Sequence, residues 1–315
     1  MTARPIIIDC DPGQDDAVAL LLAMASPGEL AIRGVTCVAG NVPLQLTAAN
    51  ARRLVELAGR TDIPVYAGCP APMLRPLVTA EYVHGKTGLD GCDLPPPSMA
   101  LADGHAVDFI VEQCLAAGPA GITLCPLGPL TNIAQAIVKD PRILPNIAEI
   151  VLMGGAAMIT GNTTPSAEFN IYVDPHAAHV VFECGRPVVM IPLDVTHKAI
   201  TTPARLDAIR AIGTRVSGSV AGMLDFYDRF DMDRYGMAGG PLHDPCVIAY
   251  LLNPGLFAGR RARVRIETRS ELTMGRTVVD WWGITGDAPN ALVLNEIDAD
   301  GFYAMLTERL ARLQA

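Results

Sequence analysis

Charged side chains are scarce in this sequence, and basic ones are scarcer than acidic ones. Asp, Glu, Lys and Arg make up 18% of the 315 residues, and 24 Lys and Arg stand against 33 Asp and Glu, a net charge of −9. This balance argues against nucleic acid or an anionic membrane as a partner, because both attract a basic surface. A low share of charge also indicates a surface partly buried against another copy, so we expect a homo-oligomer, a tetramer or a dimer.

Cysteine motifs and long apolar runs are missing as well. The eight cysteines are scattered without a CxxC pair, which disfavours a zinc site built on cysteine and indicates reduced thiols. The longest apolar run, AVALLLAMA, is about half the length of a membrane span, and the apolar residues before Asp9 are too few for a signal peptide. We therefore expect a soluble, cytoplasmic protein.

Short β-branched runs alternate with longer helical patterns along the chain. Strands are expected at 5–9, 31–38, 63–67, 121–126, 148–154 and 187–193. Helices are expected near 15–25, 44–59, 104–117, 130–139, 175–184, 203–212, 214–230, 245–252 and 299–313. This order predicts one α/β domain over residues 1–315, with a mostly parallel open sheet, a Rossmann-like core and helices on both faces. The segment 255–295 is expected to add strands near an edge.

The stretch IIIDCDPGQDDAVALLLAMA gathers four aspartates, Asp9, Asp11, Asp15 and Asp16, within eight positions. Asp15 and Asp16 open an apolar helix, where they would cap it and complement its dipole. Capping does not explain Asp9 and Asp11, which lie upstream at a Pro-Gly turn. Carboxylates this close either raise one another's pKa or share a cation, and oxygen ligands alone favour a hard ion, Ca²⁺ or Mg²⁺.

The spacing of these aspartates fails one calcium motif and fits part of a phosphatase motif. Counted from Asp9 as the first position of an EF-hand loop, position 6 is Gln14 rather than Gly, and position 12 is Leu20 rather than Glu. An apolar strand ending in Asp-x-Asp is also similar to Mg²⁺-dependent phosphatases of the haloacid-dehalogenase type, with Asp9 as nucleophile. Lys198 would supply their lysine, but no convincing acidic pair follows it. This phosphatase is the alternative hypothesis.

A second stretch, GGPLHDPCVIAYLL, places His243 and Asp244 directly before a helix that opens with proline. Asp244 would either cap that helix or give a further metal oxygen. In the second case His243 stands beside the metal as a titratable acid.

A third stretch, MGGAAMITGNTTPSAEFNIYVDP, follows a buried strand and carries Asn162, Glu168 and Asn170. It is either a solvated loop or a binding loop, since amides and a carboxylate suit a ligand with many hydroxyls. The polar residues of all these stretches follow predicted strands. Ligands of parallel sheets bind beyond the carboxyl ends of strands, so we expect the separate loops to converge there.

Taken together, these stretches resemble the inosine-uridine-preferring nucleoside hydrolase family. The resemblance rests on DCDPGQDDAVALLLA, TCVAGN, YVHGKTGLDG, PLGPLTNIA, MGGA…GN…AEFNIYVDPHAA and PLHDPCVIAYLL, in the family's order. It implies the nucleoside hydrolase fold, a bound Ca²⁺, and hydrolysis of the N-glycosidic bond of ribonucleosides to ribose and free base. We expect a lean toward pyrimidine ribonucleosides, uridine and cytidine, and a role in nucleoside salvage.

The resemblance also implies roles for individual residues. Asp11, Asp16, Asp244 and the backbone carbonyl of Leu127 would hold the Ca²⁺. Asp11 would also act as general base toward the attacking water, and His243, near the base, is a candidate catalytic residue. The expected substrate-binding residues are Asp15, Asn41, His84, Met153, Asn162, Glu168, Phe169, Asn170, Tyr227 and Tyr235.

The group that protonates the departing base stays open at this point. His243 would do so directly, or the stretch DFYDRFDMDRYGMAGG would close over the base, with Tyr227 and Tyr235 stacking on it or donating a proton. The plainer interpretation of that stretch is the solvated end of an amphipathic helix. A non-catalytic nucleoside or sugar binder is a third hypothesis, disfavoured because Asp11 and the other acidic positions are all present.

Overall fold

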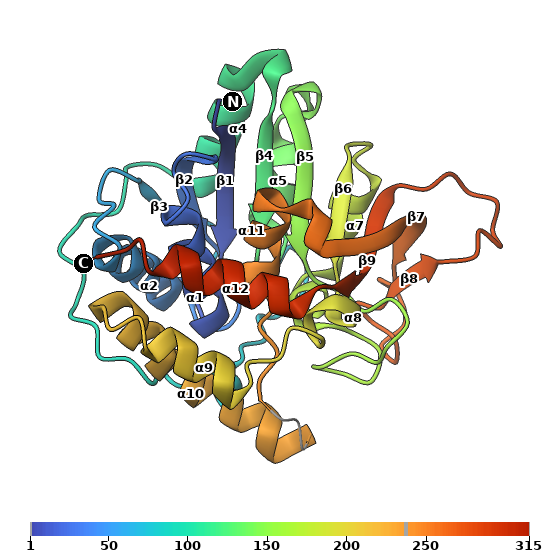
Figure 1. The fold of residues 1–315 in the computed structure, drawn as a ribbon. Helices are drawn as coiled ribbons and strands as arrows, with labels where there is room; N and C mark the ends of the chain where they lie inside the picture. Colours follow the sequence, from blue (N-terminus) through green and yellow to red (C-terminus); the bar gives the residue numbers. More distant parts are fainter. Residues whose placement is uncertain (1, 236–238, 315) are drawn as a thin grey trace.

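One nine-stranded sheet runs through the part of the chain that the structure, a computed structural model, describes (Figure 1). That part is residues 2–235 and 239–314, with the backbone alone described between 230 and 235. The strand order is β3-β2-β1-β4-β5-β6-β9-β7-β8. The strands are β1 Arg4–Cys10, β2 Leu30–Cys37, β3 Val65–Ala67, β4 Ile122–Pro126, β5 Ile147–Met153, β6 Val188–Ile191, β7 Phe257–Ile266, β8 Thr277–Asp280 and β9 Ala291–Ile297.

Strands β1 to β6 and β9 pair in parallel, and β7 pairs antiparallel with both β9 and β8. The prediction of a mostly parallel α/β sheet is therefore confirmed, as are the six predicted strands. The extra strands expected at 255–295 form one edge of the sheet. The order β3-β2-β1-β4-β5-β6 is that of a Rossmann-like sheet, whose connections change direction between β1 and β4.

Helices cover both faces of the sheet (Figure 1). They are α1 Gln14–Met24, α2 Leu44–Leu57, α3 Glu81–His84, α4 Ala106–Ala117, α5 Thr131–Lys139, α6 Phe169–Val173, α7 Pro175–Glu183, α8 Leu193–Thr196, α9 Pro203–Arg210, α10 Arg215–Tyr235, α11 Pro245–Leu252 and α12 Ala299–Leu310. Three short 3₁₀ helices lie at Gly118–Ala120, Pro141–Asn146 and Pro254–Leu256.

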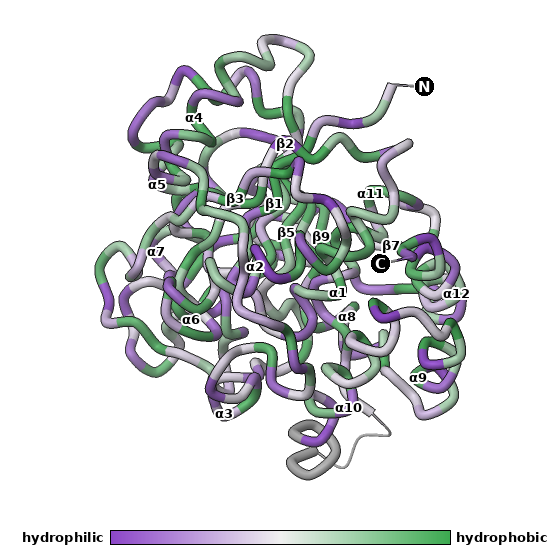
Figure 2. The backbone as a smooth tube through the Cα atoms, turned by 90° about the vertical axis from the view of Figure 1, so that its left-hand side faces the viewer, coloured by the Kyte–Doolittle hydropathy of each residue, from purple (hydrophilic) through white to green (hydrophobic). Residues whose placement is uncertain are grey.

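Alternate side chains of β1 enter two different cores. Ile6 and Ile8 pack with residues of α1, α2, α11 and α12, whereas Ile7 packs with residues of α4, α5 and α7. Because both faces are covered, the central strands read as continuous apolar runs, and hydrophobic colour gathers on them in Figure 2. Helix α1 is buried over its whole length between α2, α10, α11 and α12, which explains why its sequence is apolar all round.

The described residues bear on three features that the sequence raised: the state of the cysteines, membrane-spanning helices and apolar side chains on the surface. All eight cysteines are free thiols, and five of them are buried as small core residues. Within residues 2–235 and 239–314, no helix combines the length and apolar character needed to cross a membrane. Leu272, Trp282 and Ile284, near the antiparallel edge, are 85%, 76% and 84% exposed.

A buried polar network ties the carboxyl ends of the central strands together. The Nδ2 amide of Asn132, in α5, donates to Asp9 Oδ1 at 2.8 Å and to the carbonyl of Cys37 at 3.0 Å. Its Oδ1 accepts from the backbone N–H of Cys69 at 2.8 Å, and the Thr36 hydroxyl donates to Asp9. One side chain thus links β1, β2 and the segment after β3.

This network predicts a stability effect for Asn132→Ala. The substitution leaves the half-buried Cys69 N–H without its acceptor and removes a donor to the fully buried Asp9, so the free energy of unfolding should fall by about 2–4 kcal/mol. Urea unfolding measures the change, and Asn146→Ala, at a half-buried position, is the matched control expected to stay within about 0.5 kcal/mol. Equal losses in the two variants would contradict a special role for Asn132.

Candidate functional site

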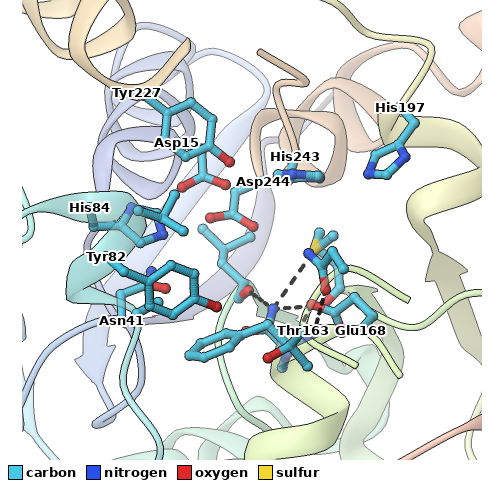
Figure 3. Close-up of a pocket in the computed structure, with 17 residues that line it drawn as sticks. Asp15, Asn41, Tyr82, His84, Thr163, Glu168, His197, Tyr227, His243 and Asp244 are labelled. Atoms are coloured by element: carbon cyan, nitrogen blue, oxygen red, sulfur yellow. Dashed lines mark hydrogen bonds between the residues drawn. The ribbon is translucent and has the colours of Figure 1, made fainter. Parts of the chain in front are cut away.

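A pocket opens at the carboxyl ends of the parallel strands (Figure 3). It encloses about 690 Å³, a volume that includes open solvent. Its lining residues come from several separate loops, as the sequence predicted. The predicted residues that line this pocket are Asp15, Asn41, His84, Leu127, Met153, Asn162, Glu168, Phe169, Asn170, Tyr227, His243 and Asp244.

Two predicted residues with described side chains are absent from this lining. They are Asp11 and Asp16, which are 1% and 0% exposed. The side chain of Tyr235 is outside the described residues.

Three buried carboxylates meet at the wall of the pocket. Oxygen atoms of Asp15, Asp16 and Asp244 all lie within 4.8 Å of one another. Asp15 and Asp16 come from the first turn of α1, and Asp244 comes directly before α11, which packs against α1. In Figure 3 the side chains of Asp15 and Asp244 face one another. The fold thus joins residues that are far apart in the sequence into one acidic cluster.

The capping interpretation holds for Asp16 and not for Asp244. Asp16 accepts from the backbone N–H of Gly13 at 3.0 Å and of Asp11 at 3.2 Å, so it closes the first turn of α1. Asp244 makes no capping hydrogen bond to α11. Oδ1 of Asp15 is buried without a hydrogen-bond partner among the described residues. A helix cap alone does not account for this cluster.

Burial makes ionisation of the cluster unfavourable. It raises the pKa of Asp15 to about 7 and that of Asp16 to about 6. Burial also raises the pKa of Asp244 well above its usual value, and the charges of Asp15 and Asp16 raise it further. A divalent cation removes this penalty, because it compensates several negative charges at once. The donors are oxygen atoms, so the residues present fit a hard cation such as Ca²⁺ or Mg²⁺.

Asp11 lies beside the cluster rather than within the group of oxygens that meet at 4.8 Å. Its Oδ2 accepts from the backbone N–H of Asn41 at 2.7 Å. The carboxylate fills the space between Gly40 and Gly128, where added Cβ atoms would lie 2.0 Å from Oδ2 and 2.1 Å from Oδ1. Burial, and then the charge of Asp16, raise the pKa of Asp11. The role of Asp11 as a metal ligand stays a prediction.

The loop between β5 and α6 is folded by its own polar side chains. Glu168 accepts from the backbone N–H groups of Gly155 at 2.9 Å, Asn170 at 2.8 Å and Ile171 at 3.2 Å, and burial raises its pKa. Asn170 Nδ2 donates to the carbonyl of Leu127 at 2.5 Å. Glu168 and Asn170 are 2% and 6% exposed, so the interpretation as a solvated loop is wrong for them.

Met153 and Asn162 take part in further hydrogen bonds of the same segment. The amide of Asn170 also reaches the carbonyl of Met153 at 3.3 Å. Asn162 Oδ1 accepts from the backbone N–H of Phe169 at 3.0 Å. Hydrogen bonds within the protein thus fix the positions of Asn162 and Asn170 in this loop.

The acidic cluster has His84 on one side and His243 on the other (Figure 3). His84 and Tyr227 lie on one side in Figure 3, with ring centroids 5.5 Å apart, and His243 and His197 lie on the other, 5.8 Å apart. Nδ1 of His243 is 2.7 Å from the hydroxyl of Thr196. Burial lowers the pKa of His84 to about 3, and it also lowers the pKa of His243. The ring of His84 is therefore neutral at pH 7 and offers one donor and one acceptor nitrogen.

Three pocket residues with polar side chains were not predicted from the sequence, namely Tyr82, Thr163 and His197. Tyr82 and Thr163 each lie within two positions of a predicted residue, so the motifs that contain them were a usable signal. No motif singled out in the sequence contains His197, and only the fold brings it beside His243.

The phosphatase alternative does not fit the geometry. Asp9 is fully buried, lines no part of the pocket, and accepts from Thr36 and Asn132. It therefore serves the strand network and is not placed to attack a substrate. Nζ of Lys198 pairs with Glu296 at 2.7 Å on an exposed surface.

Comparisons with known proteins bear on the same question. The family model described as "Inosine-uridine preferring nucleoside hydrolase" matches residues 6–304. A Salmonella typhimurium protein named pyrimidine-specific ribonucleoside hydrolase RihA is 48% identical over 309 residues, 98% of each chain. A Schizosaccharomyces pombe protein, named only as uncharacterized protein C1683.06c, is 51% identical over 308 residues, 98% of this chain and 99% of its own.

Solved structures agree. The purine-preferring ribonucleoside hydrolase from Gardnerella vaginalis superposes with a TM-score of 0.92 at 31% identity, over 99% of each chain. None of these relatives supports a phosphatase. The resemblance seen in the sequence is thereby confirmed: this chain belongs to the inosine-uridine preferring nucleoside hydrolase family and is a ribonucleoside hydrolase.

Proposed function

We propose that this protein is a calcium-dependent hydrolase of pyrimidine ribonucleosides that releases ribose and free base for nucleoside salvage. The observation that carries the proposal is the cluster of Asp15, Asp16 and Asp244, whose buried carboxylates meet within 4.8 Å beside the pocket that Asp15 and Asp244 line. The base preference is supported by the Salmonella relative, which is named a pyrimidine-specific ribonucleoside hydrolase and is 48% identical along nearly the whole chain.

The proposed ligands of the ion are carboxylates of Asp11, Asp16 and Asp244 and the carbonyl of Leu127. The closeness of Asp16 to Asp244 supports this set, and the charge of Asp16 acts on the pKa of Asp11. The carbonyl of Leu127 accepts one hydrogen bond, from Asn170, and keeps a second lone pair. When bound, Ca²⁺ would neutralise these carboxylates, bind the 2′- and 3′-hydroxyls of ribose and make a bound water more acidic.

Asp11 is the proposed general base. Its pKa is raised by burial, so it holds a proton more strongly than an ordinary carboxylate does. Asn41 and the close backbone at Gly40 and Gly128 keep its oxygens in place. Asp11 would accept a proton from the water that attacks the anomeric carbon while the base departs.

The ribose would lie against the loop that follows β5. Departure of the base leaves an oxocarbenium-like sugar, which donors and acceptors of fixed geometry stabilise. Glu168, Asn170 and Asn162 are held by backbone hydrogen bonds and would orient the hydroxyls. Asp15, whose Oδ1 has no hydrogen-bond partner among the described residues, would accept a hydrogen bond from a sugar hydroxyl.

The base would lie between the two histidine sides of the pocket. His243 is the proposed acid toward the departing base, supported by its place in the lining and its contact with Thr196. Tyr227 is buried and lies next to His84, where it would stack on the base. The part of Tyr235 stays a prediction.

We also propose that the protein assembles into a dimer or tetramer and works in the cytoplasm. The exposed Leu272, Trp282 and Ile284 support burial of this edge against another copy. Eight free thiols support a reducing compartment.

The general base can be tested with two matched substitutions. Asp11→Asn should lower kcat for uridine by about 10²–10⁴, a barrier of roughly 3–5 kcal/mol, because the amide cannot accept the proton. Asp9→Asn makes the same change two residues away in the strand network and should keep kcat within about threefold. Steady-state assays measure both, and a loss in Asp9→Asn as large as that in Asp11→Asn would contradict the assignment.

Removal of the metal should abolish turnover and change the pH dependence of stability. The raised pKa values of Asp15, about 7, and Asp16, about 6, mean that the metal-free folded protein keeps protons that the unfolded chain loses near pH 4. Its free energy of unfolding should therefore decrease as the pH rises from about 4 to about 7. A calcium concentration of 100 times the Kd at pH 8 should raise the free energy of unfolding by about 2.7 kcal/mol at pH 8. The same concentration should raise it less at pH 5, because calcium must then displace protons from the carboxylates.

Thermal unfolding at pH 5 and pH 8, in chelator and in excess Ca²⁺, measures this stabilisation, and uridine assays in the same buffers measure turnover. Equal stabilisation at both pH values, or full activity in chelator, would contradict calcium binding at the acidic cluster.

Substrate choice should follow both the sugar and the base. Uridine and cytidine should exceed inosine and adenosine in kcat/KM by at least about tenfold, as a fitted base pocket allows. Removal of the 2′-hydroxyl leaves buried polar groups unpaired, so 2′-deoxyuridine should be slower than uridine by about 10² or more. Assays of free base release test both points, and a preference for inosine would contradict the pyrimidine assignment.

A further inference from the structure

Gln14 belongs to the acidic motif but has no place in the metal cluster or in the proposed reaction. It is the first residue of α1 and is fully buried. Its Nε2 donates to the backbone carbonyl of His84 at 3.0 Å and to that of Asp90 at 3.1 Å. A carbonyl oxygen only accepts, so both contacts require the NH₂ end of the amide at this position. The orientation of the Gln14 amide is therefore determined by its surroundings.

The other end of that amide determines where the proton of His84 lies. Oε1 of Gln14 is 2.7 Å from Nδ1 of His84. A flipped ring would place a carbon there, and C–H···O contacts are longer, at about 3.3–3.6 Å. An amide oxygen cannot donate, so Nδ1 must carry the hydrogen. A neutral imidazole has one N–H, which leaves Nε2 as an acceptor.

The backbone before Gln14 holds the ring against it. A Cβ at Gly13 would lie 2.4 Å from Nδ1 and 2.7 Å from Cε1 of His84, so glycine is the residue that lets the ring approach. His84 is 6% exposed, and burial lowers its pKa to about 3, so the ring does not take up a second proton at neutral pH. The titratable side chain stacked on it is that of Tyr227, with ring centroids 5.5 Å apart.

We propose that Gln14 is a positioning residue that sets the tautomer of His84, so that His84 offers the pocket an acceptor, Nε2, rather than a donor. The consequence for recognition rests on the proposed function. An acceptor at the base side of the pocket selects a base edge that carries an N–H, such as N3–H of uridine or the amino group of cytidine. His84 then binds and orients the base, and the proton for the leaving group comes from elsewhere.

The tautomer can be observed directly in the full-length protein labelled with ¹⁵N-histidine. The chain has six histidines, and a spectrum of His84→Asn identifies the signals of His84. Correlations from ring carbon protons to both nitrogens should show Nδ1 protonated and Nε2 unprotonated. A protonated Nε2 in the wild-type protein overturns the inference, and this measurement needs no variant of Gln14 and no turnover.

Two substitutions separate the hydrogen bond from general packing. Gln14→Met keeps the shape and removes the acceptor, so His84 should lose its single tautomer. Gln14→Glu keeps an acceptor oxygen and should retain the proton on Nδ1, even though it gives up two donated hydrogen bonds. Gln135→Met, at a half-buried position of α5, is the control and should leave the His84 signals unchanged. An unchanged tautomer in Gln14→Met overturns the inference.

Kinetics with 3-methyluridine, which lacks N3–H, connect the tautomer to the base. The wild-type enzyme should favour uridine over 3-methyluridine, and Gln14→Met should reduce that ratio about three- to tenfold through KM, the range of one hydrogen bond. A ratio that stays constant while the tautomer changes overturns recognition by His84. Absence of uridine hydrolysis in the wild type would instead contradict the proposed function and leave the tautomer result standing.

Discussion

Repulsion among carboxylates that are kept out of water is the constraint on which this active site depends. Asp11, Asp15, Asp16 and Asp244 are all at most 5% exposed, and burial is the largest cause of the raised pKa of each. Such a group is unstable as free anions and stable as a cation site. Helix α1 is buried along its whole length, and the free energy of this hydrophobic packing offsets the cost of holding two of these side chains at its first turn.

The fold supplies part of the compensation without any ion. The cluster lies at the N-termini of α1 and α11, which pack against one another, and helix N-termini favour negative charge. Backbone N–H groups of Asp11 and Gly13 add hydrogen bonds to Asp16. The site also sits where the connections of the sheet change direction, between β1 and β4, so loops from several strands reach it.

One short motif reaches two parts of the pocket. Asp15 and Asp16 belong to the acidic cluster, whereas Gly13 and Gln14 contact His84. The two halves of the pocket are thereby set by one turn between β1 and α1. Because Gly13 and Gln14 both contact His84, side chains of other sizes would not fit at these two positions between the aspartates.

Periodicity and composition by themselves determined the sheet class, the positions of the main strands and helices, and the gathering of polar residues after strands, because these depend on local patterns of burial. The family motifs added the predicted site residues, and twelve of these line the pocket. Only the tertiary structure decided that Asp9 serves the strand network, that Asp15 stands beside Asp16 and Asp244, and that Gln14 meets His84, 70 positions away. Those contacts join distant segments, and a local pattern tells which side chains are buried but not which buried partner each one meets.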